Sequence, residues 1–178
     1  MISGSRTLGT VTGGLLAIAM APAPAASAST SSATPQVDRC TPAVLQLSLG
    51  PAHGAAGSVN QTLRFTNVGD TPCGMVGFPG VSYVTGDAGN QVGAPAARTG
   101  RPGTGVVLHP GQRAHSDVSY TVTQNYPDSR CAPTHVRGIR VYPPNDHSAL
   151  YVPRPTTGCA NSEADQLQVS AVRPGPGQ

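Results

Sequence analysis

The chain has 178 residues and a formal net charge of +3 at pH 7, and it contains no Trp, two Phe and five Tyr. The length suits one domain once a processed segment is removed. The small charge argues against a nucleic-acid partner. The absence of Trp argues against a sugar-binding surface, because such surfaces stack sugars on large aromatic faces.

The first 28 residues are typical of a secretory signal peptide. Arg6 gives a basic start, and the apolar run over residues 8–20 is too short to span a bilayer. The small residues Ala-Ser-Ala at 26–28 fit the cleavage pattern, so we expect residues 1–28 to be removed. The mature chain then has no transmembrane segment and is secreted, either extracellular or associated with the cell envelope.

The remaining chain divides into a tether, one domain and a tail. Residues 29–39 are rich in Ser, Thr and Pro, and such a segment cannot bury enough apolar surface to pack. Residues 40–172 are expected to form a single domain. The Pro- and Gly-rich residues 173–178 are expected to be a flexible tail.

Alternating apolar and polar side chains predict strands in the first half of the domain. The first covers Leu45–Leu49 and is followed by a Gly/Ala-rich turn over residues 50–57. The next covers Val59–Asn67, with Leu63 and Phe65 on the same face. A third covers residues 81–85 and leads through a hairpin loop into a short return strand.

Residues 106–122 predict a hairpin around which the rest of the domain is organised. A short apolar strand over Val106–Leu108 precedes a Pro110-Gly111 turn, in which Pro presets one backbone angle and Gly accepts a positive φ. The strand over Arg113–Val122 alternates strictly, which indicates one face on a core. Its small or apolar face holds Ala114, Ser116, Val118, Tyr120 and Val122.

The second half predicts a strand over His135–Tyr142, a short strand over Leu150–Val152 that Pro153 ends, and a last strand over Leu167–Ala171. Exposed or irregular segments are expected over residues 93–105, 126–133, 143–147 and 156–165.

The pattern along the whole chain is that of an all-β protein. No segment has helical apolar spacing over three turns, and 18 prolines are spread along the chain. Short strands with turn signals every eight to twelve residues predict an immunoglobulin-like antiparallel β-sandwich of seven to nine strands with two disulfides.

Four cysteines in an exported chain indicate disulfide bonds, and four cysteines allow three pairings. We favour Cys40–Cys73 with Cys131–Cys159, which closes two loops of similar size. In the chain-entropy model each bond contributes roughly 3–4 kcal/mol. A zinc site is the alternative, but no pair has the short spacing of zinc ligands.

Several motifs resemble a known family. They are Cys40-Thr41-Pro42, Leu63–Gly69, the Cys-Gly-Met-Val-Gly-Phe-Pro-Gly run at 73–80, and the Pro-Gly-Gln-Arg-Ala run at 110–114. Together they resemble a family of secreted actinobacterial domains, domain of unknown function 4232, over essentially the whole expected domain. One departure is Tyr120, where many relatives have Trp. The resemblance implies an extracellular or wall-associated β-sandwich with disulfides, and it implies no activity or catalytic residue.

His109, His115 and Asp117 are the candidates for a metal site. His115 and Asp117 lie two residues apart on one strand face, with about 7 Å between their Cα atoms. A third ligand from a neighbouring strand would complete a copper or zinc site. Ordinary polar residues on a solvated sheet face are the alternative, which we favour, so we expect no metal and no other cofactor.

The segment after the strand over residues 135–142 is a candidate binding loop. Two prolines frame it, and Tyr142, Asn145, Asp146 and His147 present varied polar groups at an end of the sandwich. Such loops on rigid scaffolds often carry recognition. Ordinary loop composition is the alternative.

Enzymatic activity is not expected. The chain has no G-x-S-x-G or H-E-x-x-H motif, and its eight carboxylates are scattered. A protease inhibitor that offers Arg98 or Arg101 would need a stiffened loop, and no cysteine lies near them. We therefore expect a non-catalytic interaction module whose partner is a protein or cell-wall component. The alternative is a small-ligand or metal-binding domain.

Overall fold

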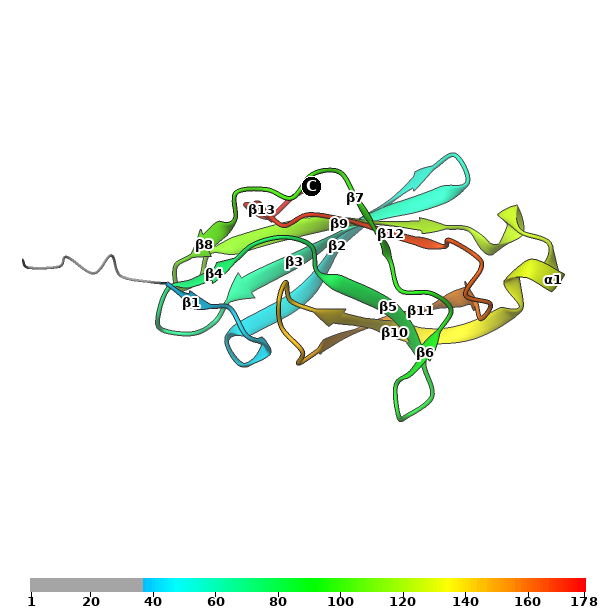
Figure 1. Ribbon diagram of the computed structural model, residues 1–178, viewed down its shortest axis with the longest axis horizontal. Coiled ribbons are helices and arrows are strands. Elements are labelled where there is room, and N and C mark those ends of the chain that lie inside the picture. The colour runs from blue at the N-terminus through cyan, green and yellow to red at the C-terminus, as the bar shows by residue number, and fades with distance from the viewer. Residues whose placement is uncertain (1–36) are drawn as a thin grey trace, which may run out of the picture. The chain divides into compact units, whose positions relative to one another are not determined.

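The computed structural model describes residues 37–178, and nearly all of their regular secondary structure is β-strand (Figure 1). The expected signal peptide and most of the expected tether lie outside the described residues. The described part has thirteen strands, two 3₁₀ helices and one four-residue α-helix. The prediction of an all-β, sandwich-like fold is confirmed. The strand count exceeds the expected seven to nine because six strands contain only two or three residues.

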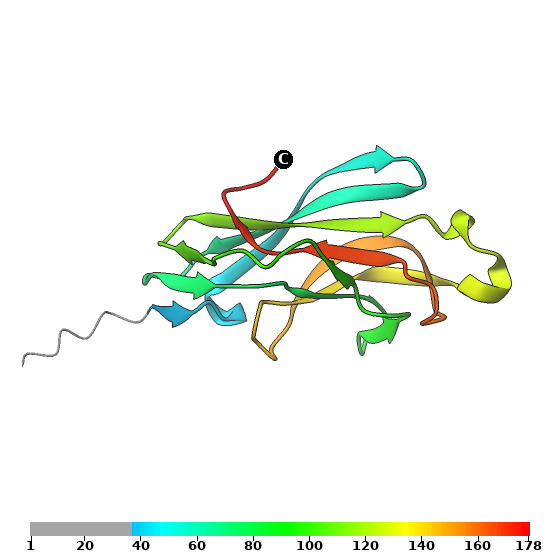
Figure 2. The ribbon, with the colours of Figure 1, turned by 45° about the horizontal axis from the view of Figure 1, so that its top comes forward.

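One layer is a six-stranded sheet with β9 near its centre (Figure 2). The order is β2-β3-β9-β12-β7, and β13 also pairs with β9. All pairs are antiparallel except the parallel pair of β12 and β7. The strands are β2 (Leu45–Ala55), β3 (Ser58–Asn67), β7 (Ala97–Thr99), β9 (Arg113–Thr121), β12 (Leu167–Ser170) and β13 (Arg173–Pro174).

Two smaller sheets pack on the first through a shared core. One has the order β11-β10-β5-β6 and the other β1-β4-β8. Buried side chains of all three sheets form one cluster, including Phe65, Ile139 and Leu108. The strands are β1 (Asp38–Arg39), β4 (Cys73–Met75), β5 (Gly80–Thr85), β6 (Asn90–Val92), β8 (Val106–Leu108), β10 (Pro133–Tyr142) and β11 (Leu150–Cys159), and the helices are η1 (Pro42–Val44), η2 (Thr123–Asn125) and α1 (Asp128–Cys131).

The alternation expected for β3 and β9 is confirmed. Leu63 and Phe65 on β3 are fully buried, as are Ala114 and Val118 on β9. The two strands pair antiparallel over nine residues of register, and Leu63 lies opposite Ser116. A period of two along both strands therefore places one face of the pair in the core.

The expected hairpin over residues 106–122 is wrong. β8 pairs with β4 in one layer, whereas β9 pairs with β3, β12 and β13 in the other. The Pro-Gly turn itself is present: the Gln112 amide donates to the His109 carbonyl, and Gly111 has a φ of 78°. The Gly111 amide also donates to the Asn67 carbonyl. The turn therefore carries the chain from one layer to the other.

Two strands are longer than expected because proline and glycine are tolerated at sheet edges. β2 continues to Ala55 through the predicted turn, with a shift of register between Leu49 and Ala52. β11 continues past Pro153 to Cys159, through part of the predicted 156–165 loop. Both strands lie at the edge of their sheets, where a missing amide hydrogen bond has little consequence.

Two short strands also occupy segments expected to be irregular. β7 lies within the predicted 93–105 loop and pairs with β12. β13 lies within the predicted flexible tail and pairs with β9. Arg64 further donates to the carbonyl oxygens of Pro176 and Gln178, at 2.7 and 2.9 Å. The tail is therefore held against the sheet.

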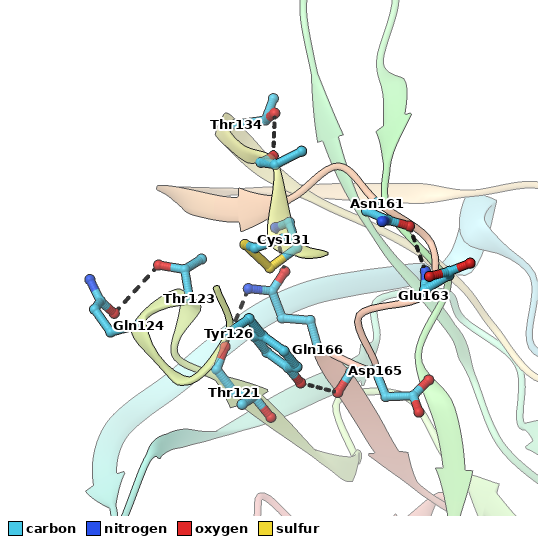
Figure 3. The surroundings of a disulfide bond; sticks show 12 residues. Thr121, Thr123, Gln124, Tyr126, Cys131, Thr134, Asn161, Glu163, Asp165 and Gln166 are labelled. Carbon is cyan, nitrogen blue, oxygen red and sulfur yellow. Dashed lines mark hydrogen bonds between the residues drawn. A yellow bond between two sulfur atoms is a disulfide. The ribbon is translucent and has the colours of Figure 1, made fainter. Parts of the chain in front are cut away.

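Both favoured disulfides are confirmed, Cys40–Cys73 and Cys131–Cys159. The second joins α1 to the end of β11, and Figure 3 shows Gln166 beside it. The Gln166 side chain accepts from the Cys159 amide at 2.8 Å and donates to the Thr121 carbonyl. The end of β11 is thus fixed to the end of β9 in the opposite layer.

Candidate binding cleft

The candidate binding loop after β10 is anchored to the three-stranded sheet. Asn145 has a φ of 59°, its carbonyl accepts from the Arg39 guanidinium, and its side-chain amide donates to the Val76 carbonyl at 3.2 Å. Asp146 accepts from the Ser148 amide at 2.7 Å, and His147 is exposed. The polar groups of Asn145 therefore hold the loop to the sheet, and Asp146 stabilises the turn that follows.

The metal candidates are not brought together as a ligand set. His109 lies in the turn between β8 and β9. Asp117 on β9 pairs with Arg173 and accepts from the Thr62 hydroxyl at 3.1 Å. His115 donates through Nδ1 to the Gly175 carbonyl. Within residues 37–178, no group of three or more His, Cys, Asp or Glu side chains could hold a metal ion.

The two arginines considered for a protease pocket lie in and beside β7. Arg98 belongs to that strand, and its guanidinium carbon lies 5.9 Å from the centre of the Phe78 ring. Arg101 follows in an exposed segment. The pairing of β7 with β12 supplies a rigidity that we did not expect for this region.

The strongest candidate site is a cleft on the outer face of the β11-β10-β5-β6 sheet. Its volume is about 340 Å³, within the usual range for pockets that take small molecules. The loop between β5 and β6 forms one wall, and the start of β11 forms another. The residues that line it are Val84, Gly86, Asp87, Ala88, Gly89, Arg137, Arg140, Ala149, Leu150 and Tyr151.

An irregularity in the pairing of β10 with β11 places the arginines on this face. The register of β10 with β11 shifts between Val136 and Gly138, where Arg137 alone lies opposite two residues of β11, Arg154 and Pro155. Val136 is buried before the bulge, and Ile139 and Val141 are buried after it. Arg140 consequently points away from the core.

Gly138 allows Tyr151 to cover the bulge. A Cβ atom at position 138 would lie 2.5 Å from the Val152 carbonyl oxygen and 2.7 Å from the Tyr151 ring. The Tyr151 hydroxyl donates to the Arg137 carbonyl at 3.2 Å. Gly138 also pairs with Val84, which is buried and gives the cleft an apolar floor.

The cleft has more positive than negative charge. Arg137 forms an ion pair with Asp87, whose side chain is fully exposed. Arg140 donates to the Gly89 carbonyl at 3.2 Å and to the Gln91 side chain at 3.1 Å, and lies over the Tyr142 ring. Its Nε is buried and has no hydrogen-bond partner within the part of the chain that the structure describes. An orphaned donor on a cation favours an anionic ligand nearby.

Sequence reasoning predicted the strand over residues 135–142 but missed this cleft. The available signal was Gly138, since an isolated glycine within a strand pattern often marks a bulge. A bulge between Arg137 and Arg140 would have placed the two side chains on the same face. The sequence placed Tyr151 in a strand, but no local pattern indicated that this strand pairs with β10 and brings the Tyr151 ring over Gly138.

These features define an all-β, disulfide-bonded domain with an arginine-lined cleft. A family model described as domain of unknown function (DUF4232) matches residues 40–173, and the chain belongs to this family. No curated protein and no solved structure matches the chain. In the part of the chain that the structure describes, no helix is long and apolar enough to cross a membrane.

Proposed function

We propose that the protein is an exported, non-catalytic binding domain that holds an anionic group of its partner in the outer-face cleft. The observation that carries this proposal is the approach of Arg137 and Arg140 to one apolar-floored cleft, where a single exposed carboxylate opposes them. Guanidinium groups recognise carboxylates and phosphates through paired hydrogen bonds.

The ligand combines a carboxylate or phosphate with an apolar part. Val84, Ala149 and Leu150 supply apolar contact, and the guanidinium groups of Arg137 and Arg140 supply the positive charge. A protein or a cell-wall component carries such a group to the cleft. Two disulfides and the signal-peptide pattern of residues 1–28 support an extracellular or cell-envelope location.

Titration of the disulfide-intact mature domain with benzoate and phenyl phosphate tests the proposal. Benzyl alcohol is the uncharged control of similar shape. We expect saturable NMR shifts at Arg140 and Tyr151 with both anions and none with the alcohol. R140Q should weaken binding roughly tenfold, the usual effect of losing a charge-assisted hydrogen bond, and R101Q should leave it unchanged.

Two results would contradict the proposal. One is an equal response to benzyl alcohol, which would make the cleft an apolar pocket without charge recognition. The other is an equal loss of binding in R101Q, which would indicate attraction by net charge alone. Capture from the producing organism's wall and secreted fractions, with the wild type and R140Q in parallel, then identifies the partner.

A further inference from the structure

A second cavity lies between the layers of the sandwich, away from the outer-face cleft. Its volume is about 200 Å³, and β3, β9, η2 and β11 contribute to its lining. The lining includes Arg154 and the hydroxyl-bearing residues Tyr120, Thr123, Thr156 and Thr157, and among the described residues it contains no Asp or Glu.

Arg154 extends from β11 toward the opposite layer. Its guanidinium carbon lies 3.7 Å from the centre of the Tyr120 ring on β9, and its Nε donates to the Gln61 side chain on β3 at 3.1 Å. Neither of the two ion pairs within residues 37–178 includes Arg154. The Tyr83 hydroxyl also lies close to Arg154. A half-buried cation that contacts aromatic side chains and an amide oxygen, but no carboxylate among the described residues, favours an added anion.

The Tyr120 hydroxyl is a second unused donor at this cavity. Tyr120 is 2% exposed, and among residues 37–178 its buried hydroxyl oxygen has no hydrogen-bond partner. Burial raises the pKa of Tyr83, which stacks on Tyr120, to about 12, and burial also raises the pKa of Tyr120. Both hydroxyls therefore keep their protons at neutral pH. A neutral phenol donates to an anion rather than repelling it.

We propose that this cavity binds a small oxyanion, with Arg154 supplying the charge and the Tyr120 and threonine hydroxyls supplying hydrogen bonds. The volume suits a phosphate, sulfate or carboxylate group and is below the range for drug-sized ligands. Because Tyr120 and Arg154 belong to opposite layers, the bound ion ties β9 to β11. It therefore stabilises the folded domain.

Thermal unfolding of the disulfide-intact mature domain in sodium phosphate, sodium sulfate and sodium acetate tests this proposal, with sodium chloride at equal ionic strength as the reference. We expect a saturable rise in Tm with at least one oxyanion. With no Trp in the chain, near-ultraviolet tyrosine absorbance reports the same event directly. The anion that raises Tm most shows whether the cavity prefers a tetrahedral oxyanion, such as phosphate or sulfate, or a planar carboxylate.

Three variants locate the ion. R154Q should weaken the oxyanion effect at least tenfold, and T156V, which preserves volume, should weaken it less. R140Q alters the outer-face cleft and should leave the effect unchanged. If R154Q does not fold, T156V provides the test together with the wild type, in which the NMR signal of the Arg154 Nε should shift on addition of the oxyanion.

The proposal is overturned if chloride raises Tm as much as the oxyanions, or if R154Q and T156V both keep the full effect. It is also overturned if R140Q alone removes the effect, because the ion then occupies the outer-face cleft. That last result would support the proposed function while rejecting the second site, so the two proposals fail separately.

Discussion

The outer-face cleft and the inter-layer cavity are each built around one arginine, but the two arginines are held in different ways. Arg140 is fixed within its own sheet by Gly89 and Gln91 of the adjoining hairpin. Arg154 crosses to the other layer and lies on Tyr120. The first site therefore depends on one sheet and its bulge, whereas the second depends on the alignment of both layers.

Removing each disulfide in turn should separate the two sites most strongly. The C131A/C159A pair should lower the free energy of unfolding by roughly 3 kcal/mol and weaken oxyanion binding, because that bond fixes the end of β11. The Cys40–Cys73 disulfide closes a loop of similar length. The C40A/C73A pair should therefore lower the free energy of unfolding by a similar amount, but it should leave oxyanion binding in the cavity unchanged. Urea unfolding measures the free energy of unfolding, and phosphate titration measures oxyanion binding. If C131A/C159A and C40A/C73A lose phosphate binding equally, the cavity does not depend specifically on how β11 is held against the opposite layer.

The bulge should be the sensitive point of the outer-face cleft. G138A should lower the free energy of unfolding by about 2 kcal/mol and weaken benzoate binding, because the new Cβ collides with Tyr151 and with the backbone of β11. G54A is the matched control, since nothing lies within 4 Å of its added Cβ. We expect G54A to change stability by less than about 0.5 kcal/mol. Benzoate affinity unchanged in G138A would show that the bulge does not shape the cleft.

Alkaline pH should destabilise the inter-layer region selectively. The pKa of Tyr83 is raised by burial to about 12 from an ordinary value of 10.0. Its contribution to stability is therefore fully present below pH 10 and is lost as the pH rises toward 12, on the order of 2 kcal/mol. Urea unfolding at a series of pH values should show this decline. Burial also raises the pKa of Tyr120, so Y83F should reduce the decline without abolishing it, and R140Q should leave it unchanged. A decline of unchanged size in Y83F would show that Tyr83 does not contribute.

Substitution of Asp87 should have the smallest effect, and it should strengthen ligand binding where the other substitutions weaken it. D87N removes the one carboxylate that residues 37–178 place at the outer-face cleft, so benzoate should bind a few-fold more tightly. Because the Asp87 side chain is fully exposed, we expect no measurable change in unfolding. D70N removes an exposed charge elsewhere and should leave affinity unchanged. A similar gain in benzoate affinity in both variants would show that the effect comes from the change in net charge and not from loss of the Arg137–Asp87 ion pair.

The successes and failures of sequence reasoning have one physical source. β3 and β9 could be predicted because their alternation is local and each buries one face. The turn at Pro110-Gly111 could also be predicted, but turn chemistry is the same whether the chain returns within a sheet or crosses to another. The hairpin was therefore wrong although its turn was right.

The sites escaped prediction because they depend on pairing partners. Pro153 ends a central strand but is accepted in an edge strand, so the length of β11, and with it the placement of Arg154, depended on where that strand lies in its sheet. The direction of Arg140 likewise depended on a bulge that exists only in register with β11.

The amino-acid sequence by itself determined an all-β domain and its main core strands, because these follow from short-range periodicity. It allowed three cysteine pairings, and the structure shows the favoured one. Only the tertiary structure decided which strands share a layer and which arginines face a cavity. Those features arise from contacts between residues far apart in the chain, where no local pattern records the partner.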